Sequence, residues 1–266
     1  MKKIIFISLI ALVFSSCKDK NIEKNAIIPE RENLSTQEII KVGFISSATD
    51  NAPLNYVDEH GKIQGFEYDI LQEIAKRNSY KFEYRYQPKS HLFDSLRNKQ
   101  YDILSGSIGI TEERKNQYAM TIPYLDAYPI TIISKDRKIK SLKDLKDKSV
   151  SIKNSPMDGF YNILHTYKES EKLDIHYTGS DWLAIKNVIK DETIAAISNS
   201  FVIPYFVEKY SDKNTPLYFS IDYNYPQEYY GFLLNKENSQ LVENINKALT
   251  DMKADGTYQT IFKKWF

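Results

Sequence analysis

The residues with the clearest chemistry lie in the stretch SGSIGITEERK, residues 105–115. The guanidinium of Arg114 can offer two parallel N–H donors to one carboxylate, and such charge-assisted pairs are strong. Gly106 and Gly109 allow the backbone to approach a bound group closely, so that amide N–H groups can add donors. The stretch therefore suggests an anion-binding site with Arg114 as its clamp.

The same stretch has a second interpretation as an ordinary helix start. Thr111 precedes Glu112 and Glu113, and this order is typical of a capped first turn with acidic residues near the helix N-terminus. Arg114 would then be solvated or paired with one of the glutamates. Thr111 is compatible with a capping role in either case, so the residues alone leave both interpretations open.

Alternating strand and helix patterns must position this stretch. The run IIKVGFIS, residues 39–46, is apolar and β-branched like a buried strand. Ile70, Leu71 and Ile74 recur at helical spacing, and FEYRY, residues 82–86, alternates as a strand does. Strands that alternate with helices predict parallel sheets packed between helices, which is an α/β fold.

A second set of strands and helices follows the strand pattern at residues 130–134. SVSIKN, residues 149–154, and TIAAISNS, residues 193–200, have strand patterns, and a helix is expected to begin at Pro156. YYGFLLNK, residues 229–236, then returns as a strand before a long C-terminal helical pattern. We therefore expect two α/β sets, with the second inserted into the first.

The N-terminus has the features of an export signal. Two lysines precede an apolar run of about eleven residues, which is too short for a stable membrane-spanning helix but suits a secretory signal. Small residues then precede Cys17, as in the lipobox of bacterial lipoproteins. We expect residues 1–16 to be a lipoprotein signal peptide, Cys17 to carry the lipid, and residues 17–37 to form a flexible tether.

Composition narrows the class of partner. The chain has 36 Lys and Arg against 35 Asp and Glu, without a basic stripe, so no nucleic-acid partner is expected. Cys17 is the single cysteine, which excludes a disulfide within the chain. The four histidines lack metal-ligand spacing, and no catalytic motif is recognised. We expect a non-enzymatic protein without metal or other cofactor.

Five segments, in this order and spacing, resemble the bacterial extracellular solute-binding proteins of family 3, which include periplasmic amino-acid-binding components of ABC importers. They are GKIQGFEYDILQEIAKR, LRNKQYDIL, SGSIGITEERKNQYAMTIPYL, SLKDLKDKSVSI and the close from YYGFLLNK to Phe266. The resemblance implies a type II periplasmic-binding-protein fold, with crossover strands near ITIIS and YYGFLL and a ligand in the cleft. Lobe one would comprise residues 38–128 and 226–266, and lobe two residues 129–225.

The resemblance also implies roles for single residues. Arg114 would grip the carboxylate of the ligand, with Ser107 and Gly109 beside it. Ser155, in KNSP, matches a loop at a helix N-terminus that receives the carboxylate from the other lobe, although a plain capping role is open. Leu54 stands where many members have an aromatic ring. Tyr56 or Tyr124 could supply the missing aromatic wall against the ligand. Both could instead be ordinary packing residues at the lobe surface.

The chain departs from the family at the ammonium site. Amino-acid receptors carry an aspartate near the end of the strand that matches TIAAISNS, where this chain has Ser200 or, alternatively, Asn199. A neutral residue cannot balance a buried ammonium. Asp158, Asp222 or Glu228 could replace it. The solute therefore stays open between an amino acid, a dicarboxylate, a keto acid, a peptide and a cell-wall fragment.

These features together predict a monomeric lipoprotein, held by its lipid to a membrane on the periplasmic side of the cell envelope. It would capture a small polar solute with an anionic group and deliver it to an ABC permease. One alternative is an enzyme resembling cyclohexadienyl or arogenate dehydratases, which would need a general acid or base in the cleft. Another is a ligand sensor that docks on a membrane partner.

Overall fold

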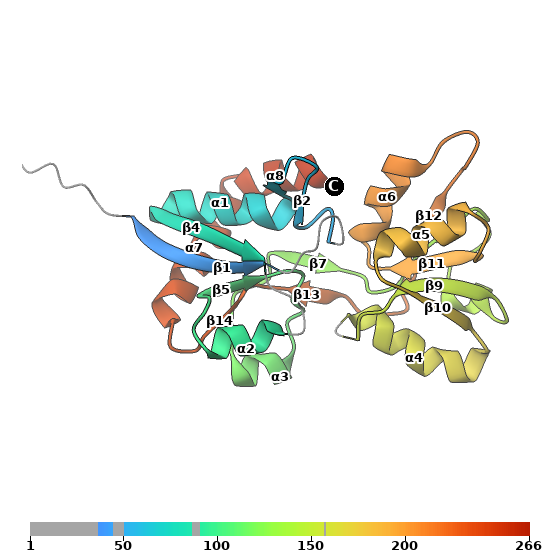
Figure 1. Cartoon of the computed structure of the whole chain (residues 1–266), viewed down its shortest axis with the longest axis horizontal. Helices are drawn as coiled ribbons and strands as arrows, with labels where there is room; N and C mark the ends of the chain where they lie inside the picture. The colour runs from blue at the N-terminus through green and yellow to red at the C-terminus, as the bar shows by residue number, and fades with distance from the viewer. Residues whose placement is uncertain (1–36, 45–50, 87–90, 157) are drawn as a thin grey trace, which may run out of the picture. The chain divides into compact units, whose positions relative to one another are not determined.

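The computed structural model describes residues 37–44, 51–86, 91–156 and 158–266 (Figure 1). The expected signal peptide, the lipidated Cys17 and the tether up to residue 36 lie outside these ranges. Among the helices within them, none combines the length and the apolar character that crossing a membrane requires.

The first sheet has five strands in the order β4-β1-β5-β14-β6. Its strands are β4 (Tyr80–Tyr86), β1 (Glu38–Phe44), β5 (Ile103–Ser105), β14 (Leu233–Leu234) and β6 (Ala119–Met120). β1 runs parallel to β4 and β5, whereas β14 is antiparallel to β5 and β6. The carboxyl ends of β1 and β5 therefore lie at one edge of this sheet.

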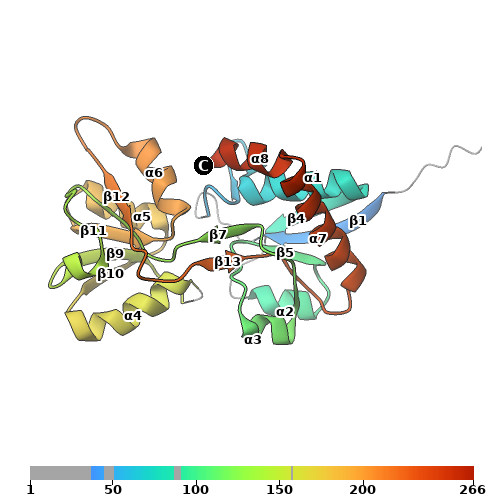
Figure 2. The ribbon, with the colours of Figure 1, turned by 180° about the vertical axis from the view of Figure 1, so that it is seen from behind.

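Helices cover both faces of the first sheet (Figures 1 and 2). They are α1 (Phe66–Asn78), α2 (Leu92–Arg97), α3 (Glu112–Gln117), α7 (Ser239–Ala254) and α8 (Thr257–Trp265). α1 and α8 lie on one face, and α2 and α3 on the other. The apolar residues of α1 that the sequence indicated, Ile70, Leu71 and Ile74, are all buried.

The second sheet has five strands in the order β10-β9-β11-β8-β12. Its strands are β10 (Asp174–Thr178), β9 (Ser149–Lys153), β11 (Ala195–Ser198), β8 (Thr131–Ser134) and β12 (Tyr218–Ile221). The accompanying helices are α4 (Gly159–Glu171), α5 (Asp181–Ile189), α6 (Val202–Tyr210) and a short 3₁₀ helix (Leu142–Leu145). α5 and α6 lie on the face opposite α4 (Figure 1).

The chain passes between the two sheets twice, through β7 (Leu125–Ala127) and β13 (Glu228–Tyr230), which pair as antiparallel strands. The predicted two-lobed α/β class is thus confirmed. One detail differs, because ITIIS contributes β8 to the second sheet and the first passage lies just before it. A two-stranded hairpin, β2 (Tyr56–Val57) and β3 (Ile63–Gln64), precedes α1.

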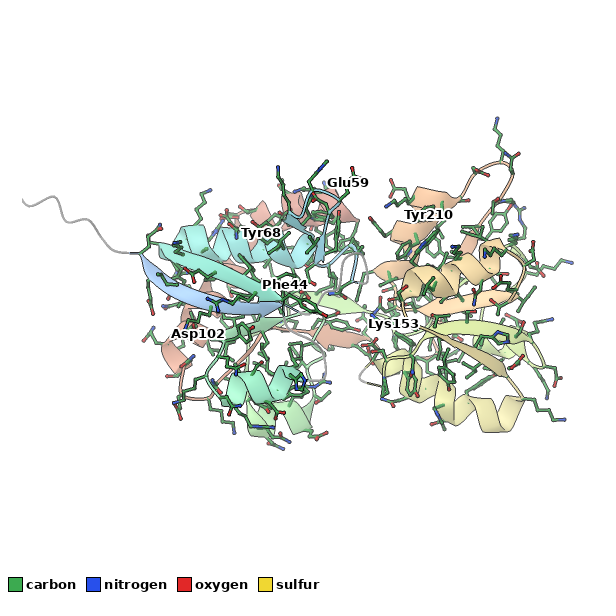
Figure 3. All side chains as sticks on the ribbon, in the orientation of Figure 1. Phe44, Glu59, Tyr68, Asp102, Lys153 and Tyr210 are labelled. Carbon is green, nitrogen blue, oxygen red and sulfur yellow. The ribbon has the colours of Figure 1, made fainter. Side chains whose placement is uncertain are left out.

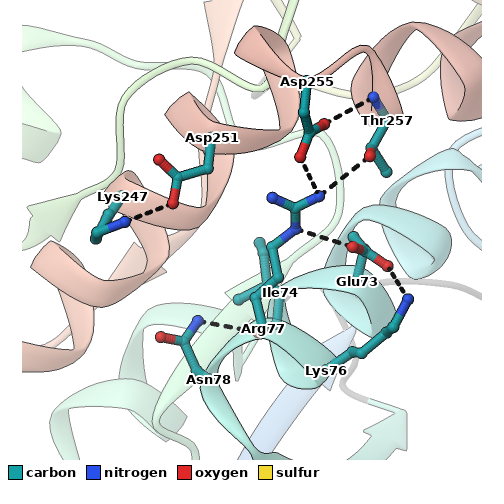
Figure 4. A network of polar contacts seen from close by, with 9 residues as sticks. All are labelled: Glu73, Ile74, Lys76, Arg77, Asn78, Lys247, Asp251, Asp255 and Thr257. Carbon is teal, nitrogen blue, oxygen red and sulfur yellow. Dashed lines mark hydrogen bonds and ion pairs between the residues drawn. The ribbon is translucent and has the colours of Figure 1, made fainter.

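A polar network ties the C-terminal helices back to α1 (Figure 4). Arg77 Nε donates to Glu73 Oε1 at 2.8 Å, and its Nη2 donates to Asp255 Oδ2 at 2.8 Å and to Thr257 Oγ1 at 3.1 Å. These contacts join a partly exposed arginine to residues that follow it by about two thirds of the length of the chain. The last segment of the chain thereby completes the first lobe.

Candidate ligand-binding site

Two adjoining cavities lie where strand ends of the two sheets approach. Phe44 ends β1 and Lys153 ends β9, and both lie toward the region between the sheets (Figure 3). The larger cavity has a volume of about 590 Å³ and the smaller about 220 Å³. Ser107, Asp158 and Tyr230 line both, so the two cavities form one continuous candidate site.

Arg114 lines the larger cavity with its side chain half-buried. Its Nη1 donates to the carbonyl oxygen of Gly109 at 2.6 Å, and its guanidinium carbon lies 5.9 Å from the ring centre of Phe93. Burial lowers the pKa of Arg114, while the carboxylates of Asp158, Glu113 and Glu228, in that order, oppose the change. The guanidinium stays a cation, because arginine is effectively always protonated in proteins.

Thr111 caps the helix that carries Arg114, as one interpretation of the sequence predicted. Its hydroxyl accepts a hydrogen bond from the backbone N–H of Arg114 at 3.2 Å, at the start of α3. Glu112 pairs with Lys115 at 2.9 Å. The cap and the exposure of Arg114 to the cavity therefore occur together, so the two interpretations of this stretch are compatible.

The segment before Arg114 is held by β-type pairing with the second passage between the lobes. Gly109 forms an antiparallel bridge with Tyr230. The N–H of Ile110 donates to the carbonyl of Tyr229 at 2.7 Å, and the N–H of Gly231 donates to that of Ile108 at 3.1 Å. This pairing sets the position of the carbonyl that orients Arg114, and Gly109 lines the cavity beside it.

A fully buried carboxylate, Glu67 on α1, supports the same wall of the site from inside the lobe. Its Oε2 accepts from Ser105 Oγ at 2.6 Å and from Asn55 Nδ2. Its Oε1 accepts from the backbone N–H of Ser107 at 2.7 Å and from the hydroxyl of Tyr124. Burial raises the pKa of Glu67, although all four donors favour the ionised form.

The loop that follows β5 supplies a backbone N–H donor to Glu67 and has an uncommon backbone conformation. Ser107 has φ 51°, in the left-handed region that non-glycine residues rarely adopt. Its hydroxyl donates to Asn51 Oδ1 at 2.9 Å. Because Glu67 binds the N–H of Ser107, it stabilises this conformation and directs Ser107 to the cavities.

Sequence reasoning missed Glu67, although a signal was present. Glu67 shares the helical spacing of Ile70, Leu71 and Ile74, so it lies on the apolar face of α1. A carboxylate on such a face needs several donors to offset its burial. The pattern indicated a buried acid, but the donors come from segments far away in sequence and could not be named.

The wall from the second lobe is built by the segment between β9 and α4. The N–H of Asn154 donates to the carbonyl of Thr178 at 2.9 Å, and that of Asp158 to the carbonyl of Ser155 at 3.0 Å. Ser155 is buried and lines the smaller cavity. The expectation of a helix from Pro156 was wrong, because α4 begins at Gly159 after a turn closed by these backbone bonds.

An ion pair lies beside this wall, at the smaller cavity. Lys153 Nζ is 3.6 Å from Asp181 Oδ2, and Asp181 Oδ1 accepts from Ser198 Oγ at 2.7 Å. Lys153, Asp181 and Ser198 all line the smaller cavity. The positive and negative charges at this end of the site thus balance each other.

Neither tyrosine proposed as an aromatic wall lines these two cavities. Tyr124 is 1 % exposed, stacks on Phe232 with ring centres 4.5 Å apart, and binds Glu67. Tyr56 makes an edge contact with Trp265 at 6.2 Å. Tyr230, the last residue of β13, lines both cavities instead, although the sequence analysis did not single it out.

At the end of β11, Asn199 rather than Ser200 lines the site. The N–H of Ser200 donates to the carbonyl of Tyr128 at 3.0 Å, and its hydroxyl accepts from the N–H of Tyr128 at 3.0 Å. Ser200 therefore links the second lobe to the first passage and lines neither cavity. Of the two residues considered at this strand end, Asn199 is therefore the one that lines the site.

The three acidic residues considered as replacements have different surroundings. Asp222 is 4 % exposed and accepts from the N–H of Leu142 at 3.0 Å and from Asn224 Nδ2 at 2.7 Å, so it is a structural residue outside the cavities. Asp158 and Glu228 both line the larger cavity. Burial raises the pKa of Glu228, and Arg114 opposes that change.

The comparisons with known proteins agree with this geometry. A profile of the bacterial extracellular solute-binding proteins, family 3, matches residues 44–266. A probable histidine-binding protein of Neisseria gonorrhoeae is 26% identical over 226 residues, which cover 85% of this chain and 83% of that protein. For the ABC transporter arginine-binding protein 1 of Escherichia coli (strain K12), the identity is 28% over 233 residues, 85% and 90% of the two chains. A solved ancestral arginine-binding protein bound to arginine is 29% identical, with a TM-score of 0.73 and coverage of 86% and 99%.

Proposed function

The chain belongs to the bacterial extracellular solute-binding proteins of family 3, and on that premise we propose that its solute is an amino acid or a related small carboxylate. The protein binds this solute between its lobes and presents it to an ABC permease. Arg114 carries the proposal, because its half-buried cation lines the cavity and is oriented by the carbonyl of Gly109. A solute carboxylate replaces water there in a charge-assisted pair.

Several residues assist Arg114 in this proposal. Ser107 and Gly109 form the first-lobe wall, and Ser155 and Asn199 belong to the second-lobe wall. Tyr230 lines both cavities and offers an aromatic surface to the carbon skeleton of the solute. The lobes close on the solute by a hinge at the two passages, β7 and β13.

The proposed division of the chain follows strand membership. Lobe one comprises residues 38–128 and 226–266, which contain all strands of the first sheet, and lobe two comprises residues 129–225, which contain those of the second. The proposal includes a signal peptide in residues 1–16, a lipid on Cys17 and a tether over residues 17–37. The protein acts as a monomer on the periplasmic side, held to a membrane by its lipid.

The binding experiment compares Arg114→Ala with Arg137→Ala in the purified full-length chain. Arg137 provides the control, because it lies on the ring of Tyr218, 4.8 Å from its centre, and does not line either cavity. The twenty amino acids, small dicarboxylates and prephenate are titrated by calorimetry. We expect Arg114→Ala to weaken binding by roughly 2 to 5 kcal/mol, because it removes one partner of a desolvated charge pair, and Arg137→Ala to leave binding unchanged.

Unchanged affinity of Arg114→Ala would contradict the clamp. Conversion of prephenate by the wild-type chain would favour the dehydratase-like alternative over a binding protein. A solute that binds with Arg114-dependent affinity but is not taken up in cells would favour the sensor alternative over the importer component.

A further inference from the structure

A separate cavity of about 250 Å³ lies outside the candidate solute site. Its walls come from α8, which accompanies the first sheet, from α6, which accompanies the second, and from β7, the first passage between them. It shares only Phe201 with the described lining of the two solute cavities. A cavity of this size suits a ligand smaller than a typical drug molecule.

The lining of this cavity combines aromatic rings with carboxylates. Its aromatic residues are Phe201, Tyr205, Phe262, Trp265 and Phe266. Asp126 and Glu208 are the charged residues of the described lining, which contains no lysine, arginine or histidine. The face of an aromatic ring attracts a cation, and so does a carboxylate. An organic ammonium ion with apolar groups around its charge would therefore match both parts of the lining.

The two carboxylates are not neutralised by the protein. Asp126 Oδ2 accepts from the neutral amide of Gln227, whose Nε2 lies 3.0 Å away. Within the described part of the chain, no lysine or arginine pairs with Asp126 or Glu208. Both residues are exposed, so they leave their negative charge at the rim of the cavity.

Two rings of this lining already receive ammonium groups of the protein. Lys264 Nζ lies 4.9 Å from the ring centre of Trp265, and Lys209 Nζ lies 5.8 Å from that of Tyr205. Neither lysine lines the cavity. The indole N–H of Trp265 donates to Asp69 Oδ2 at 2.8 Å, which fixes the orientation of the ring. The cavity therefore offers to a small cation the same chemistry that these rings show toward lysine.

We propose that this cavity is a second binding site, which takes a free organic ammonium ion of about the size of choline. The rings of Tyr205 and Trp265 contact its apolar groups, and the carboxylates of Asp126 and Glu208 attract its charge. This site differs from the solute site, where Arg114 selects an anion. Because its walls come from both lobes, the cation binds to a particular arrangement of the lobes.

Two other interpretations of the cavity make different predictions. An apolar void would accept a neutral molecule as readily as a cation of the same shape. An extension of the solute site, joined to it at Phe201, would bind its ligand in dependence on Arg114. Only a separate cation site prefers the charged molecule and is indifferent to Arg114.

The test compares choline with its uncharged isostere, 3,3-dimethylbutan-1-ol, in the purified full-length chain. Calorimetric titration gives both affinities. We expect wild type to bind choline roughly tenfold more tightly than the isostere, because only the cation gains from the ring faces and the carboxylates. Arg114→Ala should show the same affinity for choline as wild type.

Three variants locate the site, and their melting temperatures show whether each is folded. Trp265→Leu keeps an apolar side chain but removes the ring, so we expect most of the preference for choline to be lost. Glu208→Gln should weaken choline by about threefold and leave the isostere unchanged, because an exposed carboxylate contributes modestly. The control is Trp182→Leu, whose ring stacks on Tyr210 with centres 4.1 Å apart and does not line the cavity. It should keep the wild-type preference.

A quaternary ammonium group is also the headgroup of phosphatidylcholine, so vesicles of this lipid provide a further arm. We expect the chain not to sediment with the vesicles through this cavity, because the site takes the free ion. Sedimentation that Trp265→Leu abolishes would overturn the assignment and indicate a lipid headgroup.

The proposal would also be overturned if wild type bound choline no better than the isostere, or bound neither. A loss of choline binding in Arg114→Ala, or a loss in Trp182→Leu as large as that in Trp265→Leu, would contradict the location. None of these results affects the proposed function, which depends on Arg114 and on a solute carboxylate.

Discussion

The two walls of the candidate site are strand-end loops of similar length that are supported in different ways. In the first lobe, the loop after β5 is held by one buried carboxylate, Glu67, which accepts from both Ser105 and Ser107. In the second lobe, the segment after β9 is held by backbone bonds of Asn154 and Asp158. The residues that directly follow β5 therefore depend on one side chain, in addition to the strand pairing of Gly109 with Tyr230, whereas the segment after β9 is held by its own backbone bonds.

The largest expected effect is that of Glu67→Ala. The substitution leaves the four donors around Glu67 without their acceptor and opens a cavity, so we expect the free energy of unfolding to fall by roughly 3 to 5 kcal/mol. Ser155→Ala, in the other wall, should cost less, about 1 kcal/mol, because only a neutral hydroxyl is lost and the backbone bonds of that segment remain. Urea denaturation measures both, and equal losses would remove the contrast between the walls.

A smaller effect is expected in the pH dependence of folding stability. Burial raises the pKa of Glu67 above the value of 4.5 that it has when solvated, so the folded state binds its proton more tightly than the unfolded state. The contribution of this group to stability is then present at low pH and is lost as pH rises above about 4.5. Glu67→Gln does not titrate, so the stability of wild type relative to this variant should decrease from pH 4 to pH 7.

The pH series is measured by denaturant unfolding of both proteins in the same buffers. A difference between wild type and Glu67→Gln that stays constant, or that moves in favour of wild type as pH rises, would contradict a raised pKa. It would mean that the four donors outweigh burial.

The smallest expected effects on stability are those of removing two helix caps, one in each lobe. The hydroxyl of Thr111 accepts from the N–H of Arg114 at 3.2 Å, and that of Ser180 accepts from the N–H of Leu183 at 3.2 Å. Thr111→Ala and Ser180→Ala should each lower stability by about 1 kcal/mol. Only Thr111→Ala should also weaken solute binding, by less than about tenfold, because α3 orients Arg114.

Thermal unfolding and calorimetric titration with the same solute would compare the two cap variants. A loss of affinity in Ser180→Ala as large as that in Thr111→Ala would show that the first-lobe helix has no special part in binding.

Local patterns were sufficient where neighbours in sequence decide the structure. The apolar spacing of Ile70, Leu71 and Ile74 predicted α1 and its buried face, and Thr111 predicted a cap at the start of α3. The strand at residues 149–153 was expected over 149–154. The helix after it was expected too early, because the turn from Ser155 to Asp158 depends on backbone bonds that propensity alone does not reveal.

The sequence by itself determined the α/β class and the two-lobed order of elements, because hydrophobic periodicity and the family pattern are both written along the chain. It also indicated Arg114 through its place after a glycine-rich strand end. Only the tertiary structure decided that Tyr124 belongs to the interior, that Asn199 rather than Ser200 lines the site, and that Glu67 and Glu228 lie beside it. Those outcomes depend on contacts between residues far apart in sequence, whose geometry arises only when the chain folds.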